Sequence, residues 1–290
     1  MNGVRVGTSG WSYVHWDGAF YPEGTSQKMH LGHYMTRFSA VEINATFYRL
    51  PSEKAVLAWR DAGRSADSAH WGSSARESDT DGAFLFAVKG SRLITHYRRL
   101  QEVDEAASAF IQRARLLDET LGVVLWQLPA SMRRDAGVLD AFLTLLDSLP
   151  VASQESGSSD RRESPRIRHA VEFRHASWLA EETFAVLRAH DVAHVHVSSS
   201  AMPEDLTVTT DFVYVRFHGL TDYAHDYNRK QLEPWAEFLR AQYESGHGGY
   251  VFFNNDARAR APANASVLIE LLGEAAYPAG RTRREAASSR

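Results

Sequence analysis

Residues 41–51 read VEINATFYRLP. The first four alternate as a β-strand does, with Val41 and Ile43 on one side and Glu42 and Asn44 on the other. A carboxylate inside a buried strand is strongly disfavoured unless it has charged or hydrogen-bonding partners. The polar side of this strand must therefore face a shared polar space, and the remaining strands indicate where that space lies.

Strand-like apolar runs recur along the chain and alternate with helical patterns. Strands are expected at residues 4–9, 40–44, 84–90, 122–129, 169–175, 193–199, 212–219 and 250–256. Helices are expected at residues 52–62, 104–121, 137–149, 181–190, 232–245 and 264–273. This order predicts an α/β protein, a closed (β/α)8 barrel of the TIM type in a single domain. A doubly wound open sheet is the alternative, but no G-x-G-x-x-G follows any of the strands.

Some segments depart from this rhythm. Residues 62–82 and 151–168 are rich in Ser, Asp, Arg and Gly, which predicts flexible excursions from a barrel domain spanning residues 1–278. The basic tail 279–290 is predicted to be disordered. The connection 199–211 is close to the minimum length of a parallel crossover, so a degenerate helix is expected between the sixth and seventh strands.

The polar residues of the strands share one parity, which in a barrel is the side that faces the axis. In the fourth strand both parities are largely apolar and only Gln127 stands out. The side chains expected to face the axis are Glu42, Asn44, Thr46, Leu85, Ala87, Lys89, Glu172, Arg174, His194, His196, Ser198, Tyr214, Arg216, His218, Phe252, Asn254 and Asp256. The polar members concentrate at the carboxyl ends of the strands, where barrel enzymes keep their active sites.

These residues suggest acid/base chemistry or anion binding. Glu42 and Glu172 form a candidate pair in which one carboxyl donates a proton and the other accepts it, if their pKa values shift in opposite directions. The same pairing would suit glycoside hydrolysis. Arg174 and Arg216 can bind a carboxylate or phosphate, or can neutralise the two glutamates. Lys89 can bind a substrate anion, join an ion pair, or form a Schiff base if burial lowers its pKa.

The predicted catalytic residues are Glu42, Glu172, His218, Lys89 and Asp256. The predicted substrate-binding residues are Asn44, Tyr48, His96, Gln127, Arg174, Arg216, Asn254, Asn255 and Trp11. The sequence demands no cofactor. A divalent metal is an alternative, held by His96, His175 or His218 together with Glu42, Glu172 or Asp256.

Several motifs carry a family resemblance that covers about residues 4–273. They are GTSGWSYVHWDGAFYP (7–22), VEINATFYRLP (41–51), FAVKGSRLITH (86–96), VEFRHASW (171–178), YVRFHG (214–219) and FFNNDARARAPANA (252–265). With these motifs the chain resembles the YecE-like family, the domain of unknown function 72. The resemblance implies a TIM-type barrel, in agreement with the alternation of the strands, and it implies no particular reaction.

Composition limits the partners. The chain has 290 residues, a net charge of −4 and no cysteine, so disulfides and thiolate chemistry are absent and nucleic acid is an unlikely partner. No apolar run is long enough to cross a bilayer, and we expect a soluble cytoplasmic protein.

The leading functional hypothesis is an enzyme that uses acid/base chemistry on a small polar or anionic, sugar- or phosphate-like substrate at the carboxyl face of the barrel. The alternatives are a non-catalytic binder of an anionic metabolite and, further off, a metal-dependent enzyme resembling sugar isomerases or one that processes nucleic acid.

Overall fold

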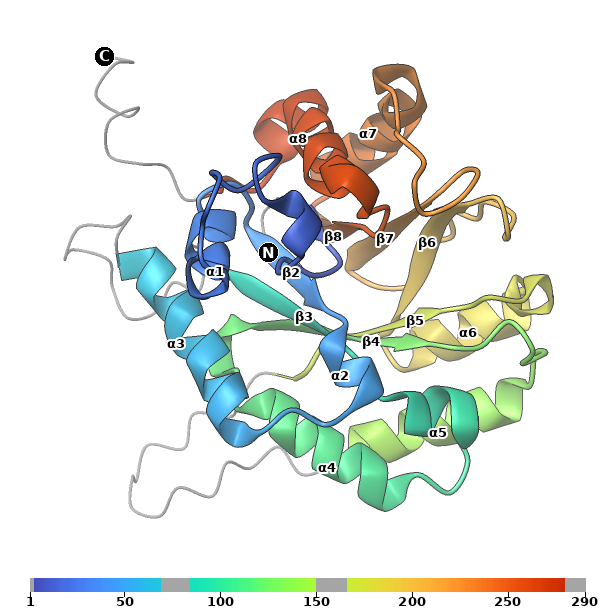
Figure 1. Ribbon diagram of the computed structural model, residues 1–290. Coiled ribbons are helices and arrows are strands. Elements are labelled where there is room, and N and C mark those ends of the chain that lie inside the picture. Colours follow the sequence, from blue (N-terminus) through green and yellow to red (C-terminus); the bar gives the residue numbers. More distant parts are fainter. Residues whose placement is uncertain (1–2, 69–83, 150–165, 280–290) are drawn as a thin grey trace.

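The computed structural model describes residues 3–68, 84–149 and 166–279 (Figure 1). Most of the two predicted excursions, and the predicted tail from residue 280 onward, lie outside these residues. Residues 62–68 were predicted to begin an excursion, but they continue helix α3 (Glu53–Ser68). Within this extension, Arg64 pairs with Glu119 at 2.5 Å and with Asp118 at 2.9 Å.

Eight parallel strands form the sheet. They are β1 (Val4–Thr8), β2 (Ala40–Ile43), β3 (Leu85–Lys89), β4 (Leu121–Gln127), β5 (His169–Glu172), β6 (Ala193–Ser199), β7 (Phe212–Gly219) and β8 (Gly248–Phe253). Their order is β1-β8-β7-β6-β5-β4-β3-β2, and a parallel bridge between Ser9 and Glu42 joins the two outer strands. The sheet therefore closes into the predicted (β/α)8 barrel of a single domain.

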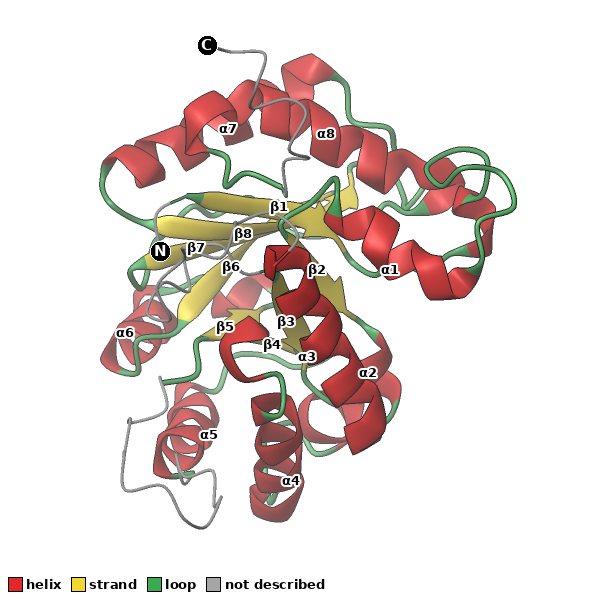
Figure 2. Ribbon diagram, turned by 90° about the vertical axis from the view of Figure 1, so that its left-hand side faces the viewer, coloured by secondary structure: helices red, strands yellow, loops and turns green. Residues whose placement is uncertain are grey.

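Helices cover the outside of the barrel (Figure 2). They are α1 (Gln27–Met35), α2 (Ala45–Tyr48), α3, α4 (Asp104–Arg115), α5 (Ala136–Ser148), α6 (Glu181–Ala189), α7 (Arg229–Glu244) and α8 (Arg260–Leu272). The helices α1 and α2 were not predicted. Residues 200–211 contain no helix, which confirms the degenerate crossover between β6 and β7. No helix in the described part of the chain is long and apolar enough to span a membrane.

Two apolar clusters lie on the two sides of the strands. Val41, Ile43, Val171 and Phe173 belong to the outer cluster, between strands and helices, as their parity predicts. The inner cluster fills the barrel with large side chains opposite small ones, as is usual for this fold. Its members are Ala40, Leu85, Ala87, Val123, Leu125, Ala170, Ala193, Val195, Val197, Phe212, Tyr214, Tyr250 and Phe252.

The predicted orientation of β6 was wrong. Val195 and Val197 occupy the interior, so His194, His196 and Ser198 face the helices. The His194 ring contacts Phe184 on α6 with ring centroids 5.2 Å apart, and the His196 ring contacts Phe238 on α7 at the same distance. Burial lowers the pKa of His194 to about 3 and that of His196 to about 4, so both are neutral at pH 7 and can lie in apolar surroundings.

The closure between β1 and β2 depends on Gly7. A β-carbon at Gly7 would lie 2.0 Å from the carbonyl oxygen of Ala40 and 2.8 Å from the hydroxyl of Tyr34. Because the first obstacle is backbone, the two strands would have to separate. We expect Gly7→Ala to lower the free energy of unfolding by about 3 kcal/mol or more.

Gly32→Ala is the matched control, because Gly32 lies inside α1 with no atom near its missing β-carbon. We expect this variant to gain about 0.5–1 kcal/mol. Urea unfolding followed by circular dichroism measures both variants. Equal stability of the two variants would show that β1 and β2 do not approach as closely as described.

Candidate functional site

The carboxyl ends of the strands hold a buried ionic cluster centred on Arg216 of β7. The Arg216 side chain is fully buried. Its Nη2 donates to Oε1 of Glu42 on β2 at 2.6 Å. Its Nη1 donates to Oε2 of Glu172 on β5 and to Oε1 of Gln127 on β4 at 3.2 Å. One guanidinium therefore joins residues from four strands around the barrel axis.

Glu42 has no free hydrogen-bonding oxygen. Besides Arg216, the hydroxyl of Ser9 donates to Oε1 at 2.7 Å and the hydroxyl of Tyr214 donates to Oε2 at 2.6 Å. Burial alone would raise the pKa of Glu42, but Arg216, Tyr214, Lys89 and Ser9 outweigh it and hold the pKa below its ordinary value. Glu42 is therefore an ionised, saturated carboxylate at neutral pH.

Glu172 is also saturated. Arg174 contacts its Oε1 through Nε at 2.7 Å, and His218 Nε2 lies 3.2 Å from the same oxygen. The amide nitrogen of Asn254 lies 3.2 Å from His218 Nδ1, and Arg216 Nη1 lies 3.4 Å from His218 Nε2, so both ring nitrogens have polar neighbours. Against the effect of burial, Arg216, Arg174 and His218 keep the pKa of Glu172 well below its ordinary value.

These shifts differ from those that the predicted carboxyl pair requires. Both carboxyl pKa values are lowered, so neither Glu42 nor Glu172 is a proton donor at neutral pH. Burial lowers the pKa of His218 to about 4, and Glu172 offsets this only in part. His218 is therefore a neutral hydrogen-bonding group. The site needs another residue if it is to exchange protons near pH 7.

Lys89 is a titratable group of this cluster whose pKa is lowered toward neutral. Its side chain is nearly buried, and its ammonium lies 4.3 Å from the centroid of the Phe47 ring. Burial and the nearby Arg216 lower its pKa to about 8, although Glu42 and Glu172 act in the opposite direction. Within the described ranges, Lys89 forms no ion pair. Lys89, Arg174 and Arg216 face only two carboxylates, so the cluster carries one excess positive charge.

The loops after β2 and β3 form one side of the site. The hydroxyl of Thr46 donates to the carbonyl of Lys89 at 2.6 Å and so ties the two strand ends together. Asn44 is half-buried, and its Oδ1 has no hydrogen-bond partner among the described residues. The His96 ring lies 4.9 Å from the Phe47 ring, and burial, with Lys89 and Arg174, lowers the pKa of His96. Tyr48 is exposed at the rim.

Asp256, Asn255 and Trp11 were predicted to belong to the site, but they lie at turns and contact residues outside the ionic cluster. The carbonyl of Asp256 accepts hydrogen bonds from His15 and Trp16. Asn255 is fully buried, and its amide donates to Asn264 at 2.7 Å. Trp11 packs against Trp59 of α3 with ring centroids 6.1 Å apart.

The metal alternative gains no support from geometry. His175 caps a short turn by accepting a hydrogen bond from the backbone of Ser177, and His218 is held between Glu172 and Asn254. In residues 3–68, 84–149 and 166–279, no three His, Asp or Glu side chains are grouped so as to hold a metal ion.

Two contributors, Ser9 and Phe47, were not predicted. Ser9 follows β1 on the parity opposite to Val4 and Val6, so the test applied to the other strands would have found it. Phe47 lies in the four-residue helix α2. No sequence pattern in so short a helix predicts the contact between the Phe47 ring and Lys89.

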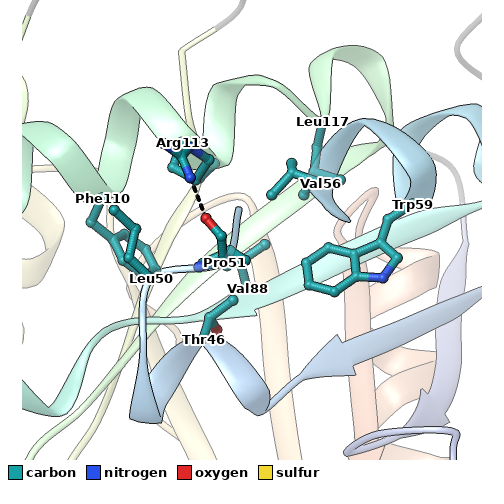
Figure 3. A pocket seen from close by; sticks show the side chains of 10 residues that line it. Thr46, Leu50, Pro51, Val56, Trp59, Val88, Phe110, Arg113 and Leu117 are labelled. Carbon is teal, nitrogen blue, oxygen red and sulfur yellow. Dashed lines mark hydrogen bonds between the residues drawn. The ribbon is translucent and has the colours of Figure 1, made fainter. Parts of the chain in front are cut away.

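A separate pocket lies outside the barrel, between α3 and α4 (Figure 3). It is an apolar cavity of about 10 Å³, with room for about one water molecule. Arg113 crosses it and donates to the carbonyl of Pro51. Val88 lines it from the outer face of β3, whereas Lys89 points to the interior, so this pocket is not part of the ionic cluster.

The fold and the cluster define a TIM-type barrel protein with a charged site at the carboxyl ends of its strands. A family model described as "Protein of unknown function DUF72" matches residues 5–287, and the chain belongs to this family.

Similar proteins agree with this assignment. The UPF0759 protein YunF of Bacillus subtilis (strain 168) is 23% identical over 301 residues, which are 93% of this chain and 94% of that protein. The crystal structure of a DUF72 family protein from Thermotoga maritima is 28% identical, with a TM-score of 0.73, and the match covers 93% of this chain and 98% of that one. A DUF72 family protein from Enterococcus faecalis V583, 18% identical, has a TM-score of 0.70 over 93% of this chain and 95% of that one, and shares the fold.

Removal of the central cation tests the ionic cluster. Arg216→Met would leave two buried carboxylates without their shared partner, and we expect it to lower the free energy of unfolding by about 3–5 kcal/mol at pH 7. Adding Glu42→Gln and Glu172→Gln to the same variant should recover part of this loss, since no buried carboxylate is then left without its main cation, while Arg174 loses its bond to Glu172. Urea unfolding at fixed salt measures the series. If Arg216→Met alone is as stable as the wild type, the pairing of Arg216 with the two carboxylates is contradicted.

Proposed function

We propose that the carboxyl end of the barrel binds a small anionic, hydroxyl-bearing substrate and that Lys89 exchanges a proton with it. The main support is the excess positive charge of the cluster. Lys89 is a buried cation without an ion pair among the described residues, while every oxygen of the two carboxylates beside it already accepts a bond. A bound anion would supply the negative partner that the Lys89 ammonium lacks.

The neighbouring residues suit such a ligand. Arg174 uses Nε for Glu172, and its terminal nitrogens face no other described carboxylate within ion-pair distance. These nitrogens and the Lys89 ammonium can together hold a carboxylate or phosphate. His96 is close enough to Lys89 and Arg174 for their charges to lower its pKa, and Asn254 contacts His218. Imidazole and amide groups such as these can bind hydroxyls.

Lys89 has the right acidity for proton exchange. A group with a pKa of about 8 is mostly protonated at pH 7 and keeps a useful basic fraction, so it can serve as acid or base. Glu42 and Glu172 then act as fixed charges that orient Arg174 and Arg216 and tune Lys89.

A non-catalytic binder of an anionic metabolite is the second candidate. It is favoured by the saturation of both carboxylates, because a binding site needs fixed cations and no group that changes its protonation. The two candidates share the anion site and differ in whether the Lys89 proton moves.

The anion site predicts a pH dependence of affinity. Lys89 is charged below its pKa of about 8 and neutral above it, so the affinity for ribose 5-phosphate should fall as the pH rises through about 8. Lys89→Met should bind weakly at every pH. Lys89→Arg should keep its affinity above pH 8, because a guanidinium stays protonated. Isothermal titration calorimetry gives the values, and a pH-independent wild type would remove Lys89 from the anion site.

Solvent deuterium separates the enzyme from the binder. A panel of phosphorylated sugars and hydroxy acids, incubated with the protein in D₂O, is followed by proton NMR for loss of carbon-bound hydrogen. An enzyme of the proposed type should exchange one such hydrogen, and Lys89→Arg should reduce the rate by a factor of about 100 or more while it retains binding. Binding without exchange by the wild type would favour the binder.

A further inference from the structure

The rim of the barrel beside Lys89 carries an exposed aromatic and cationic surface. We call Tyr48, Arg92 and Tyr97 the tyrosine rim. Tyr48 is 65% exposed and Tyr97 is 67% exposed. The guanidinium carbon of Arg92 lies 5.6 Å from the Tyr48 ring centroid and 5.5 Å from the Tyr97 ring centroid, so the cation contacts both rings.

The tyrosine rim is continuous with Lys89. The Lys89 ammonium lies 4.3 Å from the centroid of the Phe47 ring. The Phe47 ring meets the Tyr48 ring edge to face, with centroids 5.1 Å apart and an interplanar angle of 87°. Tyr48 is therefore two ring contacts away from the Lys89 ammonium.

The tyrosine rim is also electrically unbalanced. Arg92 is half-buried, and no ion pair joins it to a residue in the described part of the chain. The two loops 44–51 and 90–103 contain Arg49, Arg92, Arg98 and Arg99 but only one acidic residue, Glu102. These two segments are therefore positively charged, although the net charge of the whole chain is −4. Single exposed aromatic residues are ordinary, but aromatic rings that alternate with unbalanced cations suit a ligand with a planar ring and negative charge.

We propose that the tyrosine rim stacks on the base of a nucleotide whose phosphate lies at Lys89. The proposal rests on the anion site of the proposed function and assigns a substrate class to it. Tyrosine rings stack on bases of any sequence, and Arg92 adds a cation at the base or phosphate. The same chemistry is offered by a free mononucleotide and by the phosphorylated end of a single strand.

Three probes separate the two parts of the ligand. Adenosine 5′-monophosphate carries base and phosphate, ribose 5-phosphate lacks the base, and adenosine lacks the phosphate. Stacking should make adenosine 5′-monophosphate bind about 5- to 150-fold tighter than ribose 5-phosphate. Tyr48→Ala combined with Tyr97→Ala should remove this difference and leave ribose 5-phosphate unchanged. Lys89→Met should weaken both phosphates and leave adenosine unchanged.

Tyr243→Ala is the matched control, because Tyr243 is a partly exposed tyrosine on α7, far along the chain from the tyrosine rim. It should change no dissociation constant. A short 5′-phosphorylated oligonucleotide identifies the source of the base. Tighter, strongly salt-dependent binding than adenosine 5′-monophosphate assigns the site to the end of a strand, and equal or weaker binding assigns it to a free nucleotide.

The outcomes separate this inference from the proposed function. Equal affinity of the wild type for adenosine 5′-monophosphate and ribose 5-phosphate, or a double tyrosine variant that binds the nucleotide as the wild type does, would overturn the base site. If ribose 5-phosphate binding still depends on Lys89, the anion site survives that result. If no phosphate binds in a manner that depends on Lys89, both proposals fail together.

Discussion

The bonds from Arg216 to Glu42 and Glu172 are the constraint on which the site depends. Two carboxylates can remain ionised inside a barrel only if a cation and further donors compensate for their loss of water. Glu42 also belongs to the closure of the sheet, because its backbone forms the bridge to Ser9 while its side chain binds Arg216. Barrel closure and the charged cluster therefore depend on the same residue.

The cluster sets the properties of Lys89 without bonding to it. Arg216 disfavours a second cation nearby, while Glu42 and Glu172 favour one, and burial adds the largest effect. The result is a lysine that is charged at neutral pH but close to losing its proton. Because the carboxylates are saturated, they offer little to a cationic ligand. The side of the site that remains able to respond to a ligand is the cationic side.

Strand parity predicted most of the architecture, because the outer face of each strand packs against helices and must be apolar. This held for β2, β3, β5, β7 and β8. It failed for β6, where the valines fill the interior and neutral His194 and His196 pack against aromatic residues of the helices. Polarity was a poor guide there, since a buried neutral imidazole behaves as an aromatic ring. The helix α1 was missed because QKMHLGHYM has no apolar stripe at helical spacing.

Strand parity also predicted much of the candidate site. It did not predict the protonation states of the residues there. Parity placed Lys89, Arg174 and Arg216 on the axis side, yet only the geometry gives each carboxylate enough partners to lower its pKa. The lowered carboxyl pKa values leave neither glutamate protonated at neutral pH, whereas the pKa of Lys89 is lowered to about 8. Residues at turns, such as Asn255, depend on local backbone geometry that alternation does not encode. The ionic cluster is thus a fixed electrostatic support at the carboxyl ends of the strands, and its cation without an ion pair lies at β3, against the Phe47 ring.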